Sequence, residues 1–302
     1  MEVAKETLFI LYSIPIYTVL IGTELLLSNW QHKQYYTWRS TLENIFLTIA
    51  NGSLDLLLRS LFYFSILAWC YNHHFVQIEN TYLYWFLLFV LEDLAFYVEH
   101  RVDHYCRIFW AVHVTHHSSE DFNLTTGFRS SVLQPVYRFF YFIPLVLIGF
   151  KPIDIVFMYA LTQTYGILVH TQYIQKMPKW FEAFFVSPSH HRVHHASNII
   201  YLDKNMGMCL IIWDKIFGTY QEELETEPVK YGLTKPVQQT NNPFKLIFHE
   251  WTTLGNDLSK KTSLAVKLKY LFMPPGWSHD GSTKTANELR NELRNINSDL
   301  NG

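Results

Sequence analysis

The feature that most constrains this fold is a series of long apolar stretches. A helix needs about 20 predominantly apolar residues to cross a bilayer, and five stretches approach that length: residues 7–27, 44–71, 82–98, 132–150 and 153–174. Only 17% of the 302 residues are charged, whereas about 25% is usual for a soluble domain. We therefore predict an all-α fold, an integral-membrane helical bundle with four or five transmembrane helices.

Residues within and between these stretches refine the prediction. The first stretch has no basic region before it and no small-residue cleavage site after it, so we expect a retained anchor rather than a signal peptide. Asp55 and Arg59 interrupt the second stretch at i, i+4 spacing, which predicts a pair on one helix face. Lys151 and Pro152 separate the last two stretches and predict a hairpin.

The distribution of positive charge predicts the orientation. If the segment after the third stretch is cytoplasmic, five basic residues accompany the lysine-bearing C-terminal region on that side: Lys33, Arg39, Arg101, Arg107 and Arg129. The opposite side then holds Lys5 and Lys151, which satisfies the positive-inside rule. We predict a multi-pass protein of a bacterial inner membrane or the endoplasmic reticulum, with its histidine-rich segments on the cytoplasmic face.

The C-terminal part of the chain is more polar than the apolar first half. Beyond Tyr220, turns are expected at Pro228, Pro236 and Pro243. We predict a single membrane domain over residues 1–302, with a core at about 85–220. A cytoplasmic helical cap over 221–283 and a flexible tail over 284–302 complete it.

Charge and cysteine content exclude other classes of protein. The formal net charge is −2, and no basic stripe interleaved with aromatic residues is present, so we expect no nucleic-acid partner. Cys70, Cys106 and Cys209 lack metal-binding or redox spacing, and we expect them to be small buried apolar residues.

Histidine is the unusual residue of this sequence. Ten of the fifteen histidines fall within residues 100–117 and 170–195. His100 and His104 lie one helical turn apart and so face the same direction, as two chelating ligands do. The same helix face continues back through Tyr97 and Asp93, which predicts a polar strip at the end of the third apolar stretch.

Two HxxHH motifs follow this pair. The first is His113, His116 and His117, and the second is His191, His194 and His195. Positions i, i+3 and i+4 share one side of a helix, so each triple is predicted to present three nitrogens to a common volume. Two further histidines stand near these motifs. His170 is a candidate ninth ligand, and His190 is a candidate ligand, outer hydrogen-bond partner or spectator.

The number of candidate ligands predicts two metal ions. A tetrahedral zinc site closes at four ligands, and eight or nine nitrogens exceed that number. Imidazole suits Zn, Cu, Fe and Ni, so the ligand type alone does not name the metal. An all-nitrogen site at a membrane face, without an HExxH motif, favours oxygen activation on a lipid over hydrolysis.

Polar neighbours are expected to orient these rings. A metal-bound imidazole usually donates its remote N–H to an acceptor that fixes its tautomer. The candidate acceptors and outer partners are Glu92, Asp93, Glu99, Asp103, Asn123 and His190. The remaining histidines lack ligand spacing and are not expected to bind metal: His32, His73, His74, His249 and His279.

The order of motifs, HxxxH, HxxHH and a later HxxHH, resembles that of the fatty acid hydroxylase and sterol desaturase superfamily. Longer strings are similar to its alkylglycerol monooxygenase branch: THHSSEDFNLT at 115–125, SVLQ at 131–134, PSHHRVHH at 188–195, DKN at 203–205, LIIWDKIFGT at 210–219 and YGLTKP at 231–236. The resemblance covers residues from about 92 to 251.

This resemblance implies a membrane-bound non-haem di-iron oxygenase. Two iron ions would use O2 to insert one oxygen atom at a lipid C–H bond, and the second atom would leave as water. In the alkylglycerol branch the carbon beside the ether oxygen is hydroxylated, and the product collapses to an aldehyde and glycerol. Tetrahydrobiopterin or another external donor supplies the electrons. The implied catalytic ligands are His100, His104, His113, His116, His117, His191, His194 and His195.

Departures from the pattern leave alternatives open. Gln172 stands where an acidic residue is expected, and the additional hydrophobic C-terminal helices of the animal enzyme are not found. Residues near the second motif are expected either to line an entrance or to cap a turn: Ser118, Glu120, Asp121 and Asn123. One alternative is a sterol or fatty-acid hydroxylase or desaturase with another electron donor, and another is a non-catalytic membrane metal-binding protein.

Overall fold

The computed structural model describes residues 3–235 and 242–301, and these residues form helices and no β-strand. Two isolated backbone bridges, Phe185 with Leu210 and Ala196 with Tyr231, are the extended pairings among them. The all-α prediction is confirmed. Pro236, at which a turn was expected, lies outside the described residues.

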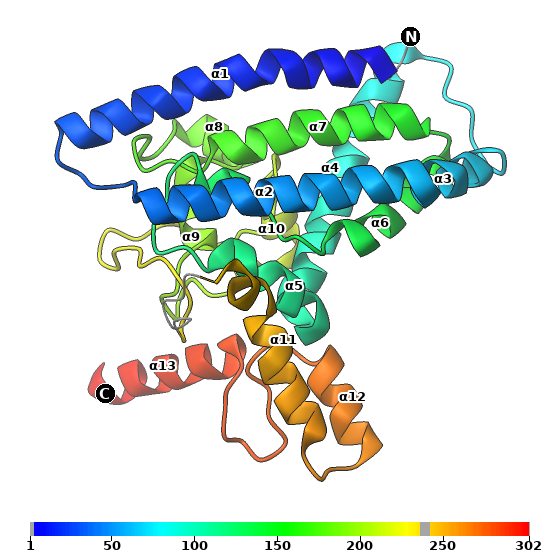
Figure 1. Ribbon diagram of the computed structural model, residues 1–302. Coiled ribbons are helices and arrows are strands. Elements are labelled where there is room, and N and C mark those ends of the chain that lie inside the picture. The colour runs from blue at the N-terminus through cyan, green and yellow to red at the C-terminus, as the bar shows by residue number, and fades with distance from the viewer. Residues whose placement is uncertain (1–2, 236–241, 302) are drawn as a thin grey trace.

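The apolar stretches form the upper part of the molecule in Figure 1. They fold into α1 (Val3–Trp30), α2 (Trp38–Leu58), the π-helical turn η1 (Arg59–Tyr63), α3 (Phe64–Tyr71), α4 (Thr81–Tyr105), α6 (Pro135–Ile148) and α7 (Pro152–Leu168). Three segments are long and apolar enough to cross a membrane: Leu11–Trp30, Trp38–Tyr71 and Thr81–Tyr105. At 14 and 17 residues α6 and α7 are shorter, so a count of four or five spans remains a prediction.

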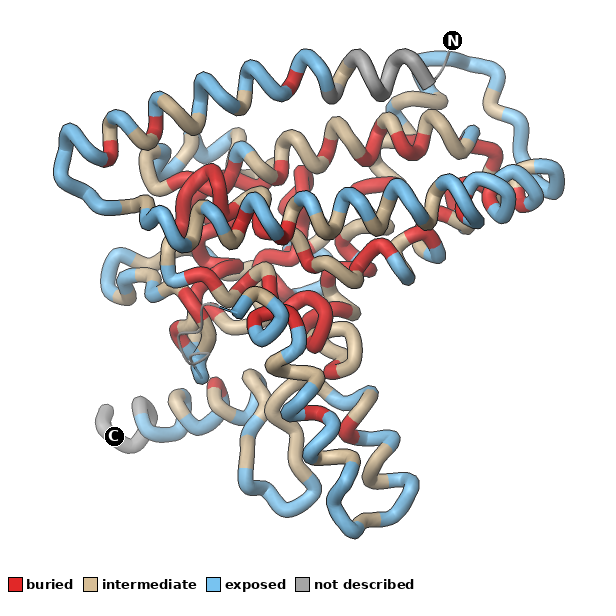
Figure 2. Tube along the Cα trace, viewed as in Figure 1, coloured by how far each residue is buried: buried red, intermediate tan, exposed pale blue. Residues whose placement is uncertain are grey.

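The surface of the long helices suits a lipid environment. Only 17% of the first span and 6% of the second are buried inside the protein, and both expose large apolar side chains such as Leu26, Ile49 and Leu56. Figure 2 shows the same contrast, with buried segments between the helices and exposed turns on the outer side of α2. A water-soluble monomer rarely leaves so large an apolar surface uncovered, whereas a bilayer covers it.

The main apolar core holds α3, α4, α6 and α7 together. It includes Leu67, Leu88, Val146 and Ile155, one from each of these helices. The hairpin between α6 and α7 turns at Gly149, whose φ is +117°. A Cβ at this position would lie 2.1 Å from the Val76 carbonyl oxygen, so both the conformation and the close approach require glycine.

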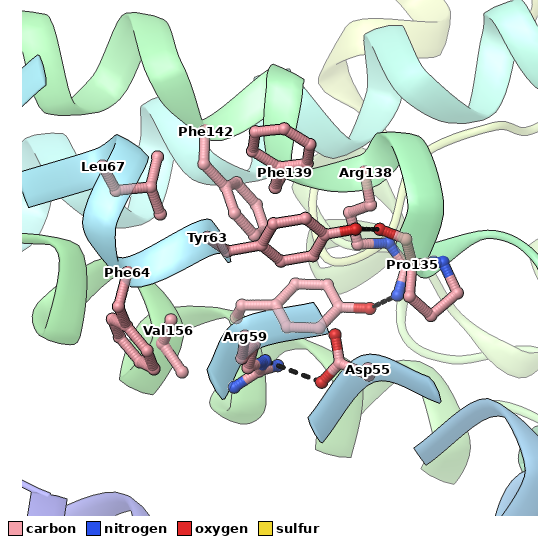
Figure 3. A pocket seen from close by; sticks show the side chains of 11 residues that line it. Asp55, Arg59, Tyr63, Phe64, Leu67, Pro135, Arg138, Phe139, Phe142 and Val156 are labelled. Atoms are coloured by element: carbon pink, nitrogen blue, oxygen red, sulfur yellow. Dashed lines mark hydrogen bonds and ion pairs between the residues drawn. The ribbon is translucent and has the colours of Figure 1, made fainter. Parts of the chain in front are cut away.

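The predicted pair within the second span is present. Arg59 Nε lies 2.6 Å from Asp55 Oδ2, at the start of the π-helical turn η1. Tyr63, in the same turn, donates its hydroxyl to the Pro135 carbonyl at 2.5 Å and so joins η1 to α6 (Figure 3). Pairing lowers the cost of placing two charges in an apolar segment.

The remaining elements gather beside and below this bundle (Figure 1). They are α5 (Arg107–His117), the 3-10 turn η2 (Thr126–Phe128), α8 (Lys179–Phe184), α9 (Pro188–His194), α10 (Ile212–Phe217), α11 (Pro243–Ser259), α12 (Leu264–Phe272) and α13 (Ala286–Asn301). The expected tail region is thus helical over most of its length. Arg290 of α13 donates to the Leu202 carbonyl.

Two short helices, α5 and α9, carry six of the fifteen histidines, and local contacts fix both. Ser187 caps α9 by accepting the His190 backbone N–H, and the His190 ring accepts the Ser187 N–H in return. At the start of α5, Arg107 pairs with Glu250 at 3.0 Å and with Asp257 at 2.7 Å, both on α11. Polar contacts at the ends of α5 and α9 therefore hold the two histidine-bearing helices.

Candidate metal centre

The structure brings the nine predicted ligand histidines together in two groups. We call the first the five-histidine cluster, and it contains His100, His104, His113, His117 and His194. We call the second the four-histidine cluster, and it contains His116, His170, His191 and His195. Within each group one ring nitrogen of every residue lies within 4.8 Å of the others. Each group therefore has the size of a single-ion site.

Each HxxHH motif is divided between the clusters. On α5, His113 and His117 at i, i+4 spacing join the five-histidine cluster, whereas His116 joins the other. The second motif divides as well, since His194 joins the five-histidine cluster and His191 and His195 the four-histidine cluster. The expectation of a common volume for each triple is therefore corrected, because one helical turn spreads three rings over two neighbouring volumes.

The Nε2 atoms approach one another closely inside each cluster. In the five-histidine cluster, His113 Nε2 lies 3.1 Å from His100 Nε2 and 3.1 Å from His117 Nε2. In the four-histidine cluster, His170 Nε2 lies 2.9 Å from His191 Nε2 and 3.1 Å from His195 Nε2. The clusters also touch, since the His117 and His195 rings stack with centroids 4.5 Å apart.

Hydrogen bonds at Nδ1 decide what these Nε2 atoms can do. Four rings donate Nδ1–H to a backbone carbonyl: His100 to Met206 at 2.8 Å, His116 to Arg129 at 2.8 Å, His170 to Gly166 at 2.7 Å and His194 to Lys204 at 2.9 Å. A neutral imidazole that donates from Nδ1 carries a lone pair on Nε2. Several lone pairs that converge at about 3 Å repel one another unless a cation lies between them, so the donor set fits a metal ion.

The electrostatic surroundings keep these rings neutral. Burial lowers the pKa of His116 to about 4, from its ordinary value of 6.5. Burial, together with neighbouring histidines, holds the pKa values of His117, His191 and His195 well below that value. Because a metal ion binds the neutral imidazole, both clusters stay competent for binding at neutral pH.

Among the acidic residues of α4, Asp103 lies beside a histidine ring, whereas Glu99 contacts residues that surround Asp103. Asp103 Oδ2 lies 3.6 Å from His113 Nδ1 and accepts Gln134 Nε2 at 2.8 Å. Glu99, expected to meet a ring directly, instead accepts Gln134 Nε2 and Arg138 Nε, each at 3.0 Å. Its side chain therefore acts one step further from the metal centre than predicted.

Four other expected ring partners lie elsewhere, which corrects the prediction. Asp93 accepts the backbone N–H groups of Cys209 and Leu210 and the Trp213 indole N–H, because it lies two helical turns from His100. Asn123 bonds to Tyr35 and Thr125 and shapes a turn. His190 serves as a helix cap, and its Nε2 has no hydrogen-bond partner in the described residues. Glu92 accepts from the Thr162 hydroxyl rather than from a ring.

The residues proposed for an entrance also hold the loop together. Asp121 Oδ2 accepts the Thr37 backbone N–H at 3.2 Å and its hydroxyl at 2.6 Å. Ser118 donates to the Thr115 carbonyl and accepts from Arg129. Gln172, where an acidic residue was expected, donates to the Phe122 carbonyl at 2.8 Å.

The loop after α9 supplies ring partners that sequence reasoning missed. Asp203 Oδ1 lies 3.2 Å from His104 Nδ1, and the Lys204 carbonyl accepts His194 Nδ1–H at 2.9 Å. Asp214 accepts the Met206 and Gly207 N–H groups, which positions the carbonyl used by His100. The strings at 203–205 and 210–219 contain Asp203, Lys204 and Asp214. The resemblance of those strings to the family was the sequence signal that could have identified these ring partners.

A chamber of about 110 Å³ lies against both clusters. His100 and His113 of the five-histidine cluster line it, together with three members of the other cluster: His116, His170 and His191. Its other walls come from α2, α4, α6, α7 and the loops at 127–131 and 207–208. A molecule in this chamber would contact the metal-facing rings of both clusters.

Comparisons with known proteins show what the segment that holds this site resembles. Residues 85–219 match the family model described as fatty acid hydroxylase. Alkylglycerol monooxygenase of Homo sapiens is 40% identical over 197 residues, covering 64% of this chain and 42% of that protein. The Xenopus tropicalis protein of the same name is 36% identical over 193 residues, with 64% and 42% covered. Ornithine lipid hydroxylase of Rhizobium tropici is 26% identical over 149 residues, with 49% and 45% covered.

This chain spans less than half the length of these curated relatives. No solved structure matches it. The matched segment begins within α4, ends just after α10 and includes all nine clustered histidines. Over residues 85–219, the segment that contains both clusters, the chain is therefore similar to the fatty acid hydroxylase family.

Proposed function

We propose that this protein is a membrane-bound non-haem di-iron oxygenase that hydroxylates a lipid with O2. The observation that carries the proposal is the pair of touching histidine clusters beside one chamber, next to helices long enough to cross a bilayer. Such a reaction converts a lipid C–H bond, O2, two electrons and two protons into a C–OH group and water. Imidazole ligands suit iron among other transition metals.

The residues of the chain prepare this site. Four carbonyl oxygens and the Asp203 carboxylate fix the Nδ1–H tautomers of five rings, so the Nε2 lone pairs of these rings point inward before any ion arrives. Burial keeps the rings neutral and limits access of water. Iron held in the two clusters would supply the redox chemistry that reduces O2 and oxidises the C–H bond.

We propose alkylglycerols as the substrates and cleavage of the ether bond as the outcome. The 40% identity to the human protein named alkylglycerol monooxygenase supports this choice. Hydroxylation of the carbon beside the ether oxygen gives a hemiacetal, which collapses to an aldehyde and glycerol. Tetrahydrobiopterin or another external donor would supply the electrons.

A second candidate is hydroxylation of another membrane lipid with a different electron donor. The similarity to a protein named ornithine lipid hydroxylase favours it. The match covers 45% of that protein, about the same share as the 42% of the human alkylglycerol monooxygenase. Sterol or fatty-acid hydroxylation or desaturation would use the same histidines. Product analysis distinguishes these reactions.

We further propose that the protein lies in a bacterial inner membrane or the endoplasmic reticulum, with both clusters facing the cytoplasm. Lys33, Arg39 and Arg101 on the cluster side support this orientation. The whole chain would act as one domain, with α11 and α12 in its cytoplasmic cap. Attachment of α5 to α11 through Arg107 supports this view.

The direct test compares lipids from cells with and without the protein by mass spectrometry. The proposal expects alkylglycerols to fall and the matching aldehydes or acids to rise, in wild-type cells only. Purified protein in membranes should show the same conversion with O2 and reduced pterin. Oxidation of a sterol, a fatty acid or an ornithine lipid instead would support the second candidate, and unchanged lipids would contradict both.

A further inference from the structure

The chamber beside the clusters is lined by polar residues besides the histidines, and we call these residues its polar wall. They are Asn51 of α2, Gln134 just before α6, Arg138 of α6, and Tyr159 and Gln163 of α7. At about 110 Å³ the chamber far exceeds the roughly 10–15 Å³ that one water molecule requires. A purely apolar chain segment in the chamber would offer no acceptor to any donor of this wall that lacks a partner, which is costly in a buried site.

One donor on this wall has no partner in the described part of the chain. Gln163 Nε2 is buried and makes no hydrogen bond there. The other amides of the wall do have hydrogen-bond acceptors. Asn51 donates to the Ser131 carbonyl at 2.8 Å, and Gln134 donates to Glu99 and Asp103. A buried amide without an acceptor is unfavourable. Gln163 is therefore placed to donate to an oxygen of a bound molecule.

The charges around the chamber favour a neutral molecule. Among the described lining residues the non-histidine charges are Arg129 and Arg138. Arg138 Nε bonds to Glu99 at 3.0 Å, and Arg129 donates to Asn44 at 2.8 Å and lies 3.4 Å from Glu43. Because each guanidinium already faces a carboxylate, neither offers a free positive charge to a carboxylate or phosphate head group. Hydroxyl groups match this wall better.

A narrow, mainly apolar cleft adjoins the chamber (Figure 3). Its volume is about 20 Å³, and Leu67, Phe139, Phe142 and Val156 contribute apolar walls. The paired Asp55 and Arg59 also line it. The cleft extends to η1, on a span of which only 6% is buried in the protein. It therefore leads toward the lipid-facing side of the bundle.

Two residues belong to both spaces. Arg138 and Tyr159 line the chamber and the cleft, and the Arg138 guanidinium donates to the Tyr159 hydroxyl between them. The guanidinium also lies 5.0 Å from the Tyr159 ring centroid. This contact forms a partition between a polar chamber at the metal centre and an apolar cleft at the membrane flank.

We propose that the chamber binds the neutral, hydroxyl-bearing head of a lipid, with Gln163 as a head-group donor, and that the alkyl chain reaches the cleft when the contact between Arg138 and Tyr159 opens. The inference rests on the proposed function and narrows its substrate class. The oxidised carbon must lie within a few atoms of the head group, as in a glycerol ether. A sterol, whose ring carbons extend far from its hydroxyl, fits this arrangement poorly.

The head-group half of the proposal is tested by equilibrium binding without turnover. Iron-loaded full-length protein in nanodiscs is kept free of O2, and binding of radiolabelled 1-O-hexadecylglycerol is compared with that of hexadecanoate and cholesterol. Gln163→Leu should weaken alkylglycerol binding about fivefold to tenfold, the effect of one lost hydrogen bond. The matched change Gln175→Leu, at an exposed glutamine, should leave it unchanged. Equal binding by wild type and Gln163→Leu would overturn this assignment.

The chain half is tested by photolabelling of the unaltered protein. An alkylglycerol with a diazirine in mid-chain should label residues of η1, α3, α6 or α7 that line the cleft. Label confined to α5 or α11 would overturn the route. In addition, Val156→Phe should shorten the longest alkyl chain accepted, whereas Val136→Phe, at a half-exposed site on α6 outside both spaces, should not.

These measurements separate the inference from the proposed function. If the protein binds alkylglycerol through Gln163 but no oxidised lipid forms under any donor, the head-group site stands and the oxygenase assignment fails. If lipid is oxidised while Gln163→Leu and the labelling pattern disagree with the proposal, the oxygenase assignment stands and the binding map fails.

Discussion

The two histidine clusters differ in what lies behind their rings. In the five-histidine cluster, carboxylates stand at two Nδ1 atoms, Asp203 at 3.2 Å from His104 and Asp103 at 3.6 Å from His113. In the four-histidine cluster, His116 and His170 donate their Nδ1–H to carbonyl oxygens, those of Arg129 and Gly166. A carboxylate behind an imidazole raises its basicity more than a neutral carbonyl does.

Each cluster also contains one ring whose Nδ1 is buried without a hydrogen-bond partner in the described residues, His113 in the five-histidine cluster and His191 in the four-histidine cluster. The two rings differ in that His113 Nδ1 has the Asp103 carboxyl group 3.6 Å away. The smaller cluster has an aromatic wall, since Phe122 stacks on His170 with centroids 5.5 Å apart. We infer that the five-histidine cluster holds its metal more tightly and that the four-histidine cluster is the more exchangeable site.

The largest expected effect comes from removing one ligand from each cluster in turn. His117→Gln should lower iron by about one ion per chain through the five-histidine cluster, and His191→Gln should do so through the four-histidine cluster. Activity should fall at least about 100-fold in both, since even outer hydrogen-bond partners are worth 10–100-fold. Metal analysis and turnover check this, with His73→Gln at an exposed histidine as control. Full activity in either variant would show that the two clusters do not act together.

A smaller effect is expected from Asp203→Asn, which changes only the five-histidine cluster. Asp203 has a φ of +53°, a conformation that asparagine also tolerates, so the backbone should be kept. Loss of the carboxylate behind His104 should weaken binding of one iron about 10–100-fold. Competition with a chelator measures this, and Asp280→Asn, at an exposed turn, is the matched control. Equal weakening of both ions would contradict the independence of the clusters.

The response to acid should be shared by both clusters. The pKa of buried His116 is about 4, below its ordinary 6.5, so the unfolded chain binds more protons between these values. The free energy of unfolding of the metal-free protein should therefore decrease as the pH falls from about 6.5 toward 4. Iron should remain bound at pH 5.5, because protons compete with it only near the lowered pKa values. Release with a midpoint near 6.5 would indicate exposed rings instead.

The smallest effect is expected at the aromatic wall of the four-histidine cluster. Phe122→Leu removes the ring that packs against His170 and stacks on Tyr231 with centroids 4.7 Å apart. It should lower the free energy of unfolding by about 1 kcal/mol and speed chelator removal of one iron a few-fold. Thermal unfolding and extraction kinetics test this against Phe184→Leu, a change at an exposed phenylalanine. Faster loss of both ions would mean that the wall protects the whole centre.

The sequence predicted the ligands better than it predicted their surroundings. Ligand spacing depends on the local period of a helix, so His100 with His104 and the two HxxHH motifs were recognisable along the chain. The division of each motif between clusters depends on how α5 and α9 are placed relative to each other. The helical spacing of residues within one segment does not predict that placement. Asp203 and the Met206 carbonyl meet rings about a hundred residues earlier in the chain, and only tertiary packing brings them there.

The acidic residues of α4 show the same limit. Asp93, Glu99 and Asp103 all lie near the first histidine pair in sequence, yet only Asp103 approaches a ring. Asp93 instead accepts hydrogen bonds from residues 209–213, and Glu99 accepts one from Arg138. These partners become neighbours of α4 only in the folded protein. The all-helical fold was predictable from long apolar stretches, whereas the number of spans depends on where the bilayer meets the short helices α6 and α7.

The most direct test of the account is the metal content of the purified full chain after iron-replete expression. Elemental analysis should find two iron ions per chain, and X-ray absorption should show coordination dominated by nitrogen. Chelation should then remove the ions in two steps, one from each cluster, with the four-histidine cluster losing its ion first. One ion per chain, or none, would contradict the central claim that the two histidine clusters form a di-iron centre.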